Sequence, residues 1–371
     1  MVIRAILAVT GMAALAVAPH AAVHAEVTAS PFGRIHFDFM SGQDDVAELG
    51  SGTEFRRARI GLGGTIADEW NYKAEYDFGG GDAAFKDVYI AYTGWAGGDL
   101  LIGHFKPGFS LENMTSANYI TLMERAMPVE AFAYSERTGI GLRGAAGGLT
   151  YSATVFGQEE SVDDNNADEG WGVVGRLAWG APFGERGLIH LGGAASWEEP
   201  ETTELDEFRY RARPEAHVTS RRLVDVTVPD ARSHQKYGLE AALVLGPVSL
   251  QGEYLWADVD AASGNDPTFS GWYAYASWFL TGESRPYKGG KFDRVQADGA
   301  WEVAARFSSL DLNDAGYAGG EQENVTLGLN YYHRPNLRFM FNYVMGSADP
   351  SSAGVEDEPE VFEARAQVDF K

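Results

Sequence analysis

Apolar and polar side chains alternate in successive stretches of roughly ten residues between Gly33 and Phe370. Neighbouring residues of an extended strand point to opposite faces, so each stretch predicts a strand with one apolar and one polar face. In the last stretch the apolar face holds Phe362, Ala364, Ala366, Val368 and Phe370, and the polar face holds Glu363, Arg365, Gln367 and Asp369. A soluble β-sandwich also alternates, but many such stretches separated by turn residues are typical of a membrane-spanning β-barrel.

Sixteen stretches of this kind are bounded by Gly, Pro, Asn or Asp. They predict strands at 33-41, 54-66, 70-79, 83-94, 98-106, 137-145, 149-158, 169-180, 187-198, 234-246, 248-260, 268-282, 300-313, 323-333, 337-347 and 360-370. The predicted fold class is all-β, a sixteen-stranded antiparallel transmembrane β-barrel. An even number of strands places both termini on the same, periplasmic side of the membrane.

The connections between the predicted strands are of two kinds. Asp68-Glu69, Gly147-Gly148, Gly246-Pro247 and Pro335-Asn336 read as tight turns. Three connections, 107-136, 199-233 and 283-299, are much longer than a turn needs. We expect the function to reside in these three segments.

The N-terminus predicts export. Arg4 precedes an apolar run from Ala5 to Ala18, and small residues suited to signal-peptidase cleavage follow up to Ala25. We therefore interpret residues 1-25 as a cleaved signal peptide and residues 26-371 as one barrel domain. The alternative is an N-terminal membrane anchor, but the run is shorter than the roughly 20 residues that a spanning helix needs.

Composition narrows the possible functions. The formal net charge of -24 argues against a nucleic-acid partner, and the absence of Cys excludes a thiolate metal site or a nucleophilic Cys. No pair of His residues has metal-ligand spacing, so the sequence predicts neither a metal site nor a cofactor. A barrel enzyme would need a Ser and His on one face, whereas Ser233 and His234 are neighbours whose side chains point to opposite faces. The sequence therefore predicts that the protein is not an enzyme.

The clearest candidate chemistry is a row of arginines in the second long connection. Arg209, Arg211 and Arg213 alternate, so an extended segment would place them on one face about 6–7 Å apart, and Arg221 and Arg222 follow. Guanidinium groups are charged at any working pH and match the oxygens of phosphate or carboxylate, so such a row forms successive anion sites. Alternatively, these arginines pair with acids of their own loop, namely Glu204, Asp206, Glu207, Glu215 and Asp225.

Other basic residues are candidates for the barrel lumen. Alternation places Arg34, Arg57 and Arg59 on the inward, polar faces of the first two strands. The third long connection carries Arg285, Lys288, Lys291 and Arg294. The alternative is that these cations pair with lumenal acids and only stiffen the barrel wall.

Several motifs, in order, resemble the phosphate-selective porin O and P family. They are 54-62 (EFRRARIGL), 70-78 (WNYKAEYDF), 86-92 (KDVYIAY), 102-109 (IGHFKPGF), 116-125 (SANYITLMER), 279-283 (FLTGE) and 299-306 (GAWEVAAR). The resemblance implies a sixteen-stranded, usually homotrimeric channel in the outer membrane of a Gram-negative bacterium, in contact with lipid and lipopolysaccharide. It also implies that two extracellular loops and one periplasmic connection fold into the lumen, and these correspond to the three long connections.

The resemblance further implies passive diffusion of inorganic anions, phosphate above all, along an arginine ladder to a lysine-rich constriction. Arg209, Arg211 and Arg213 match the ladder, which Arg34, Arg57 and Arg59 extend, and the constriction candidates are Lys106, Arg125, Arg285, Lys288 and Lys291. The connection 107-136 departs from the family pattern, because Arg125 is its only basic residue against several Glu. The alternatives are a weakly selective general porin for small polar solutes or organic anions and, from other classes, a barrel enzyme or an adhesin.

Overall fold

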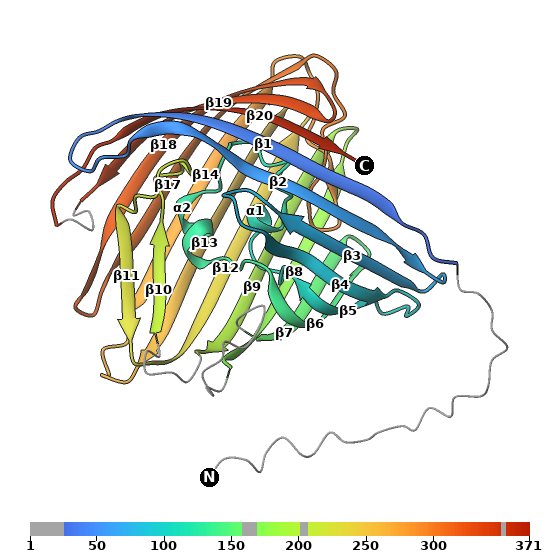
Figure 1. Ribbon diagram of the computed structural model, residues 1–371, viewed down its shortest axis with the longest axis horizontal. Helices are drawn as coiled ribbons and strands as arrows, with labels where there is room; N and C mark the ends of the chain where they lie inside the picture. The colour runs from blue at the N-terminus through green and yellow to red at the C-terminus, as the bar shows by residue number, and fades with distance from the viewer. Residues whose placement is uncertain (1–25, 158–168, 201–206, 350–353) are drawn as a thin grey trace, which may run out of the picture.

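The computed structural model describes residues 26–157, 169–200, 207–349 and 354–371, so the predicted signal peptide lies outside it. Within these residues, sixteen strands close into one antiparallel barrel, and β1 pairs with β20 to complete the ring (Figure 1). The barrel strands are β1 (Ser30–Gln43), β2 (Ser51–Ile66), β3 (Trp70–Asp77), β4 (Ala84–Tyr92), β5 (Asp99–Phe105), β6 (Arg137–Ala146), β7 (Leu149–Gly157), β8 (Trp171–Phe183), β9 (Gly187–Glu199), β12 (Ala231–Leu245), β13 (Val248–Ala261), β14 (Thr268–Phe279), β17 (Ala300–Asp314), β18 (Tyr317–Arg334), β19 (Leu337–Ala348) and β20 (Glu360–Phe370). The sixteen-stranded barrel predicted from the alternation is confirmed.

The barrel is apolar outside and polar inside. In β1, Phe37 and Phe39 are 40% and 42% exposed, whereas the alternating residues His36 and Asp38 are buried. In β20, Phe362 is likewise exposed and Glu363 is buried. This inversion of the usual burial pattern places large apolar side chains where lipid would contact them and polar groups in the lumen.

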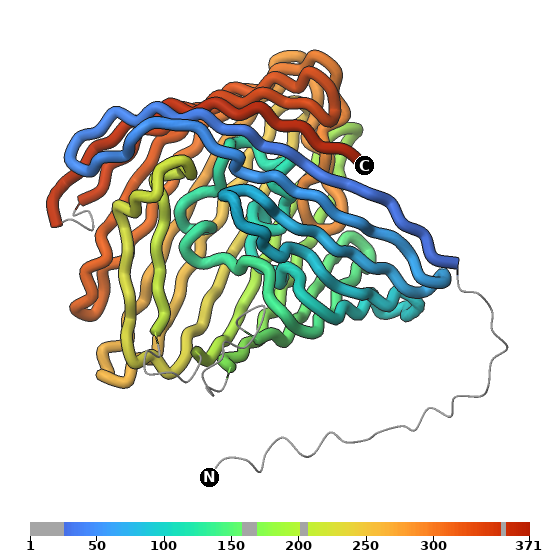
Figure 2. Tube along the Cα trace, viewed as in Figure 1, coloured from blue at the N-terminus to red at the C-terminus, as the bar shows by residue number. Residues whose placement is uncertain are grey.

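The long connections add two short helices and two hairpins to the interior of the barrel (Figure 2). The connection after β5 contains two short helices, and those after β9 and β14 each contain a two-stranded hairpin. They are α1 (Leu111–Met114), α2 (Met127–Phe132), β10 (Glu207–Ala212), β11 (Val224–Pro229), β15 (Tyr287–Lys288) and β16 (Lys291–Phe292). Neither helix in the described part of the chain is long and apolar enough to cross a membrane.

The hairpin of β10 and β11 packs against the inner wall of the barrel. Phe208 and Tyr210 are buried in one apolar cluster with wall residues such as Leu255 and Phe269. The helix α2 joins the same cluster through Phe132. Two of the long connections therefore pack together on one side of the lumen.

The three long connections approach the lumen from opposite ends of the barrel. Strands β5 and β9 are the fifth and ninth barrel strands and run in the same direction, whereas β14 is the twelfth and runs in the opposite direction. The connections after β5 and β9 therefore enter through one mouth, and the connection after β14 enters through the other. Side chains from both mouths meet inside, where Arg294 donates to the hydroxyl of Tyr119 at 3.0 Å.

Candidate functional site

A cavity of about 480 Å³ lies inside the barrel, between the inner wall and the inward-folded connections. Among the described residues, eleven Lys or Arg side chains line it against five Asp or Glu. The basic residues are Arg34, Arg56, Arg57, Arg59, Lys73, Lys86, Lys106, Arg125, Arg143, Arg213 and Lys291, and the acids are Glu75, Asp87, Glu124, Glu130 and Glu136. The cavity is thus strongly basic although the chain as a whole carries a formal charge of -24.

A β-bulge increases the positive charge of the wall on β2. Phe37 pairs with Phe55 and His36 pairs with Arg57, so Arg56 is an extra residue between two paired positions. A bulge places two consecutive residues opposite one and locally breaks the alternation. Both Arg56 and Arg57 line the cavity as a result.

A second bulge acts in the same way on β4. Ala74 pairs with Val88 and Tyr76 pairs with Phe85, which leaves Lys86 and Asp87 opposite the single residue Glu75 of β3. Lys86 and Asp87 both line the cavity. The wall therefore contributes more lumenal charges than strict alternation would supply.

Lys106 and Arg125 bring positive charge from the connection after β5. The Nζ of Lys106 donates to Oδ1 of Asn113 at 3.2 Å and lies 4.0 Å from Oε1 of Glu136. Burial, followed by the nearby charge of Arg125, lowers the pKa of Lys106 to about 7. Burial would raise the pKa of Glu136, but Lys106 and Lys86 outweigh it and hold that pKa well below its ordinary value.

Lys291 reaches the cavity from the other mouth, on the hairpin of β15 and β16. Its ammonium makes no hydrogen bond or ion pair with any residue that the structure describes. Burial, followed by the charge of Arg143, lowers its pKa. A buried ammonium without a carboxylate partner is stabilised more by an incoming anion than an ammonium that is already paired with a carboxylate.

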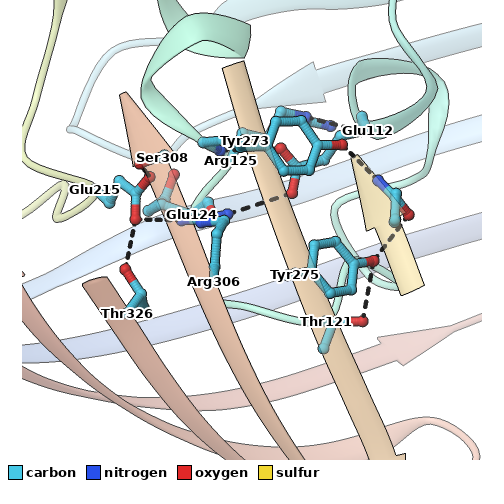
Figure 3. Close-up of polar contacts among 12 residues, drawn as sticks. Glu112, Thr121, Glu124, Arg125, Glu215, Tyr273, Tyr275, Arg306, Ser308 and Thr326 are labelled. Carbon is cyan, nitrogen blue, oxygen red and sulfur yellow. Dashed lines mark hydrogen bonds and ion pairs between the residues drawn. The ribbon is translucent and has the colours of Figure 1, made fainter. Parts of the chain in front are cut away.

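The acids of the connection after β5 attach it to the wall. Glu112 lies 3.3 Å from Arg306 on β17, which also lies 2.6 Å from Glu215 of the connection after β9 (Figure 3). Glu215 accepts further hydrogen bonds from Ser308 and Thr326, both at 2.5 Å. The buried Arg306 thus holds two inward-folded connections in place.

Glu124 joins the same connection to the first and last strands. It accepts from Arg56 at 2.9 and 3.0 Å and from Arg365 at 2.6 Å. Arg365 also donates from Nε and Nη2 to the two carboxylate oxygens of Asp38, at 2.7 and 2.6 Å. Glu112 and Glu124, two of the acids that set this connection apart from the family pattern, are thus structural partners of wall arginines.

The predicted arginine row is divided between open lumen and cavity. Phe208 and Tyr210 face the wall, so Arg209 and Arg211 point away from it, and both are exposed. Arg209 forms a two-point pair with Asp225 at 2.7 and 2.6 Å, whereas Arg211 makes no hydrogen bond or ion pair within the described residues. Arg213 lines the cavity and lies 3.1 Å from Glu130.

The self-pairing alternative therefore applies to only part of the loop. Asp225 pairs as that alternative expects, but Glu215 binds the wall through Arg306, Ser308 and Thr326. Two other expected partners, Glu204 and Asp206, lie outside the described residues.

In addition to Arg209 and Arg211, four of the predicted ladder and constriction residues do not line the cavity. Arg285 is buried against the wall, where it donates to the hydroxyl of Tyr275 at 2.6 Å and its guanidinium lies 3.6 Å from the centre of the Phe292 ring. Lys288 is exposed on the hairpin of β15 and β16. Arg221 donates to the carbonyl of Glu48, and Arg222 donates to the carbonyl of Ser220 and lies 3.6 Å from Glu130.

Four basic residues of the cavity were not singled out from the sequence: Arg56, Lys73, Lys86 and Arg143. Alternation places Lys73 on an inward face, so the sequence contains the information that would identify Lys73 as a lumenal cation. Arg56 and Lys86 lie at the two bulges, where alternation fails. Arg143 is half exposed and pairs with Asp99 at 3.2 Å near one end of the barrel.

Comparisons with known sequences agree with the resemblance found in the motifs. The family described as phosphate-selective porin O and P matches residues 32–370. Porin O of Pseudomonas aeruginosa is 29% identical over 363 residues, which cover 85% of this chain and 82% of that protein. An uncharacterized protein of Caulobacter vibrioides is 31% identical over 369 residues, which cover 91% of this chain and 73% of that protein.

Solved structures with the same fold are outer-membrane channels. The anion-selective porin from Comamonas acidovorans has a TM-score of 0.62 at 13% identity, with 93% of this chain and 100% of that chain covered. OmpT of Vibrio cholerae, solved in a trimer form, has a TM-score of 0.58 at 13% identity, with 93% and 99% covered. Because the family match spans nearly the whole barrel, this chain belongs to the phosphate-selective porin O and P family and is an outer-membrane porin, not an enzyme.

Proposed function

We propose that this porin passes small inorganic anions, phosphate above all, across the outer membrane by passive diffusion through the basic cavity. The observation that carries the proposal is the excess of eleven basic over five acidic side chains around that cavity. In a narrow lumen with low-dielectric walls, such an excess raises the local concentration of anions. Family membership and the fold shared with an anion-selective porin support the same function.

The positions of the basic residues suggest a path with several weak sites. An anion would first meet Arg211, whose guanidinium is exposed and has no partner among the described residues. It would then reach Arg213 at the edge of the cavity and finally Lys106 and Lys291 inside it. Conduction requires that each site bind an ion strongly enough to admit it and weakly enough to release it, which a series of partly neutralised cations provides.

Phosphate suits the cavity because several guanidinium groups converge there. Arg34 donates to Glu75 at 3.1 Å and Arg59 donates to Asp77 at 2.7 Å, and both line the cavity. Planar guanidinium forks match oxyanions through two hydrogen bonds, which favours phosphate over a spherical halide.

One observation favours a second candidate, a weakly selective porin for small polar solutes or organic anions. Many of the cavity cations already face a carboxylate, for example Lys86 and Glu136 at 3.5 Å and Lys73 and Asp87 at 2.6 Å. Paired cations bind an incoming anion less tightly than free ones. The two candidates differ in whether phosphate competes with chloride.

Single-channel current in a planar bilayer distinguishes them. Chloride current is recorded while phosphate is added, and the reversal potential is measured across a salt gradient. Block by micromolar to millimolar phosphate with an anion-favouring reversal potential supports the proposal. Conduction without block would instead support the general porin, and the absence of current from folded protein would refute both.

We further propose that residues 1–25 are a cleaved signal peptide and that the porin assembles as a homotrimer in contact with lipid and lipopolysaccharide. The exposed apolar side chains on the outer face and the trimer form of OmpT support this assembly. N-terminal sequencing of protein from outer-membrane fractions tests the cleavage. Cross-linking in the native membrane tests the trimer, and monomeric products alone would contradict it.

A further inference from the structure

The connection after β14 forms a strap across its mouth of the barrel and presents Lys291 to the cavity. At one end Arg285 is fixed on Tyr275, and at the other Arg294 pairs with Asp369 of β20. Between them, the hairpin of β15 and β16 turns at Gly289 and Gly290, which both have positive φ. The position of the Lys291 ammonium therefore depends on what holds this hairpin.

Two polar contacts attach the hairpin to the wall. The hydroxyl of Tyr287 is hydrogen-bonded to Nδ1 of His190 on β9 at 2.6 Å, and His190 is fully buried. Arg176 on β8 donates from Nη2 to the carbonyl of Gly290 at 2.8 Å and is itself fixed by Glu240 at 2.8 Å. The wall side of each contact is a strand of the barrel, so the contacts connect a short turn to a rigid support.

Steric fit restricts the hairpin to the same place. A Cβ at Gly180 would lie 2.5 Å from the Tyr287 ring, and a Cβ at Gly290 would lie 2.2 Å from Oγ1 of Thr150. Phe292 lies on the same face of the hairpin as Tyr287, with the two ring centroids 5.8 Å apart, and packs in an apolar cluster with Leu111 of α1. The hairpin is thus enclosed between the wall and the inward-folded connection after β5.

We propose that Tyr287, His190 and Arg176 are positioning residues, which hold the Lys291 ammonium in the cavity and thereby set the affinity of the channel for oxyanions. This inference rests on the proposed function. Lys has a long flexible side chain on a hairpin of only four paired residues, and without these contacts its ammonium would sample many positions. Fixing the hairpin in advance removes that entropic cost from anion binding.

The test is a double-mutant cycle in the planar-bilayer phosphate-block experiment. Tyr287→Phe keeps the ring but removes the hydroxyl, and Lys291→Gln removes the charge. We expect Lys291→Gln to raise the half-blocking phosphate concentration about tenfold and Tyr287→Phe to raise it about fivefold. In the double variant we expect no further loss beyond Lys291→Gln, because Tyr287 acts through Lys291.

Two other variants separate positioning from general damage. Tyr343→Phe is the matched control, since it removes a hydroxyl that donates to Glu360 at 2.6 Å on the outer face, and it should leave the block unchanged. Gly180→Ala removes no polar group but pushes on the Tyr287 ring and its hydroxyl, and it should reproduce the effect of Tyr287→Phe. All variants should keep the wild-type heat-dependent shift in gel mobility that reports a folded barrel.

The possible outcomes identify which proposal fails. Weaker block from Tyr287→Phe that disappears in the Lys291→Gln background supports the inference. No effect of Tyr287→Phe or Lys291→Gln, or equal effects of Tyr287→Phe in both backgrounds, overturns the inference and leaves the anion porin intact. Absence of phosphate block in the wild-type channel overturns the proposed function and the inference together.

Discussion

Lys106 is expected to make the anion preference of the channel depend on pH. Its pKa is about 7, because burial and Arg125 disfavour the charged form. A lowered lysine pKa means that the ammonium is present below pH 7 and is lost as the pH rises through 7. With this pKa, about 90% of the channels carry the charge at pH 6 and about 10% at pH 8.

The size of the effect follows from Coulomb's law. An anion about 7 Å from the Lys106 ammonium is stabilised by about 2 kcal/mol at an effective dielectric constant of about 20. That free energy corresponds to about a thirtyfold change in local anion affinity. The reversal potential in a chloride gradient should therefore move from strongly to weakly anion-selective between pH 5 and 9, with its midpoint near 7.

Chloride is the appropriate ion for this assay because, unlike phosphate, it does not titrate in the same range. Lys106→Arg should remain anion-selective at every pH, and Lys106→Gln should be weakly selective at every pH. His217 also lines the cavity, so His217→Gln is a matched control and should keep the wild-type curve. A wild-type midpoint in the Lys106→Gln channel would refute the assignment.

Two further perturbations test other parts of the structure. Arg211→Ala should reduce anion selectivity at 0.1 M salt and have little effect at 1 M salt, because salt screens exposed charges. Arg209→Ala should reduce selectivity less, because Asp225 already neutralises Arg209. Equal effects of the two variants on the reversal potential would contradict this reasoning. Arg365→Gln should destabilise the barrel by roughly 3–5 kcal/mol, because it removes the buried cation that lies between Glu124 and Asp38. An unchanged unfolding temperature in detergent would contradict this prediction.

Most of the barrel follows from the sequence because lipid and water impose opposite demands on alternate residues. The predicted strand at 360-370 has the observed bounds of β20, and the prediction at 323-333 lies within β18. The extension of β18 back to Tyr317 was missed, since Gly319 and Gly320 carry no side chain that could reveal a face. Such errors affect strand ends and not the number of strands.

The candidate site is less predictable because it depends on contacts between distant residues. Glu124 and Arg365 are 241 positions apart, and no local pattern indicates that this acid binds a wall arginine instead of opposing an anion. Arg285 has the charge expected of a constriction residue, yet Tyr275 and Phe292 bury it against the wall. Charge can be read from the sequence, but the partner that neutralises it cannot.

The bulge at Arg56 suggests how the lumen of such a barrel can evolve. A one-residue insertion in a regular strand would exchange inside and outside for every residue beyond it, and lipid-facing charges would then prevent assembly. A bulge absorbs the insertion, so that Phe55 and Ile60 both remain on the outer face while an additional guanidinium enters the channel. Single-codon insertions at strand bulges therefore offer a route to new permeation properties that leaves the number of strands, and the surface seen by the membrane, unchanged.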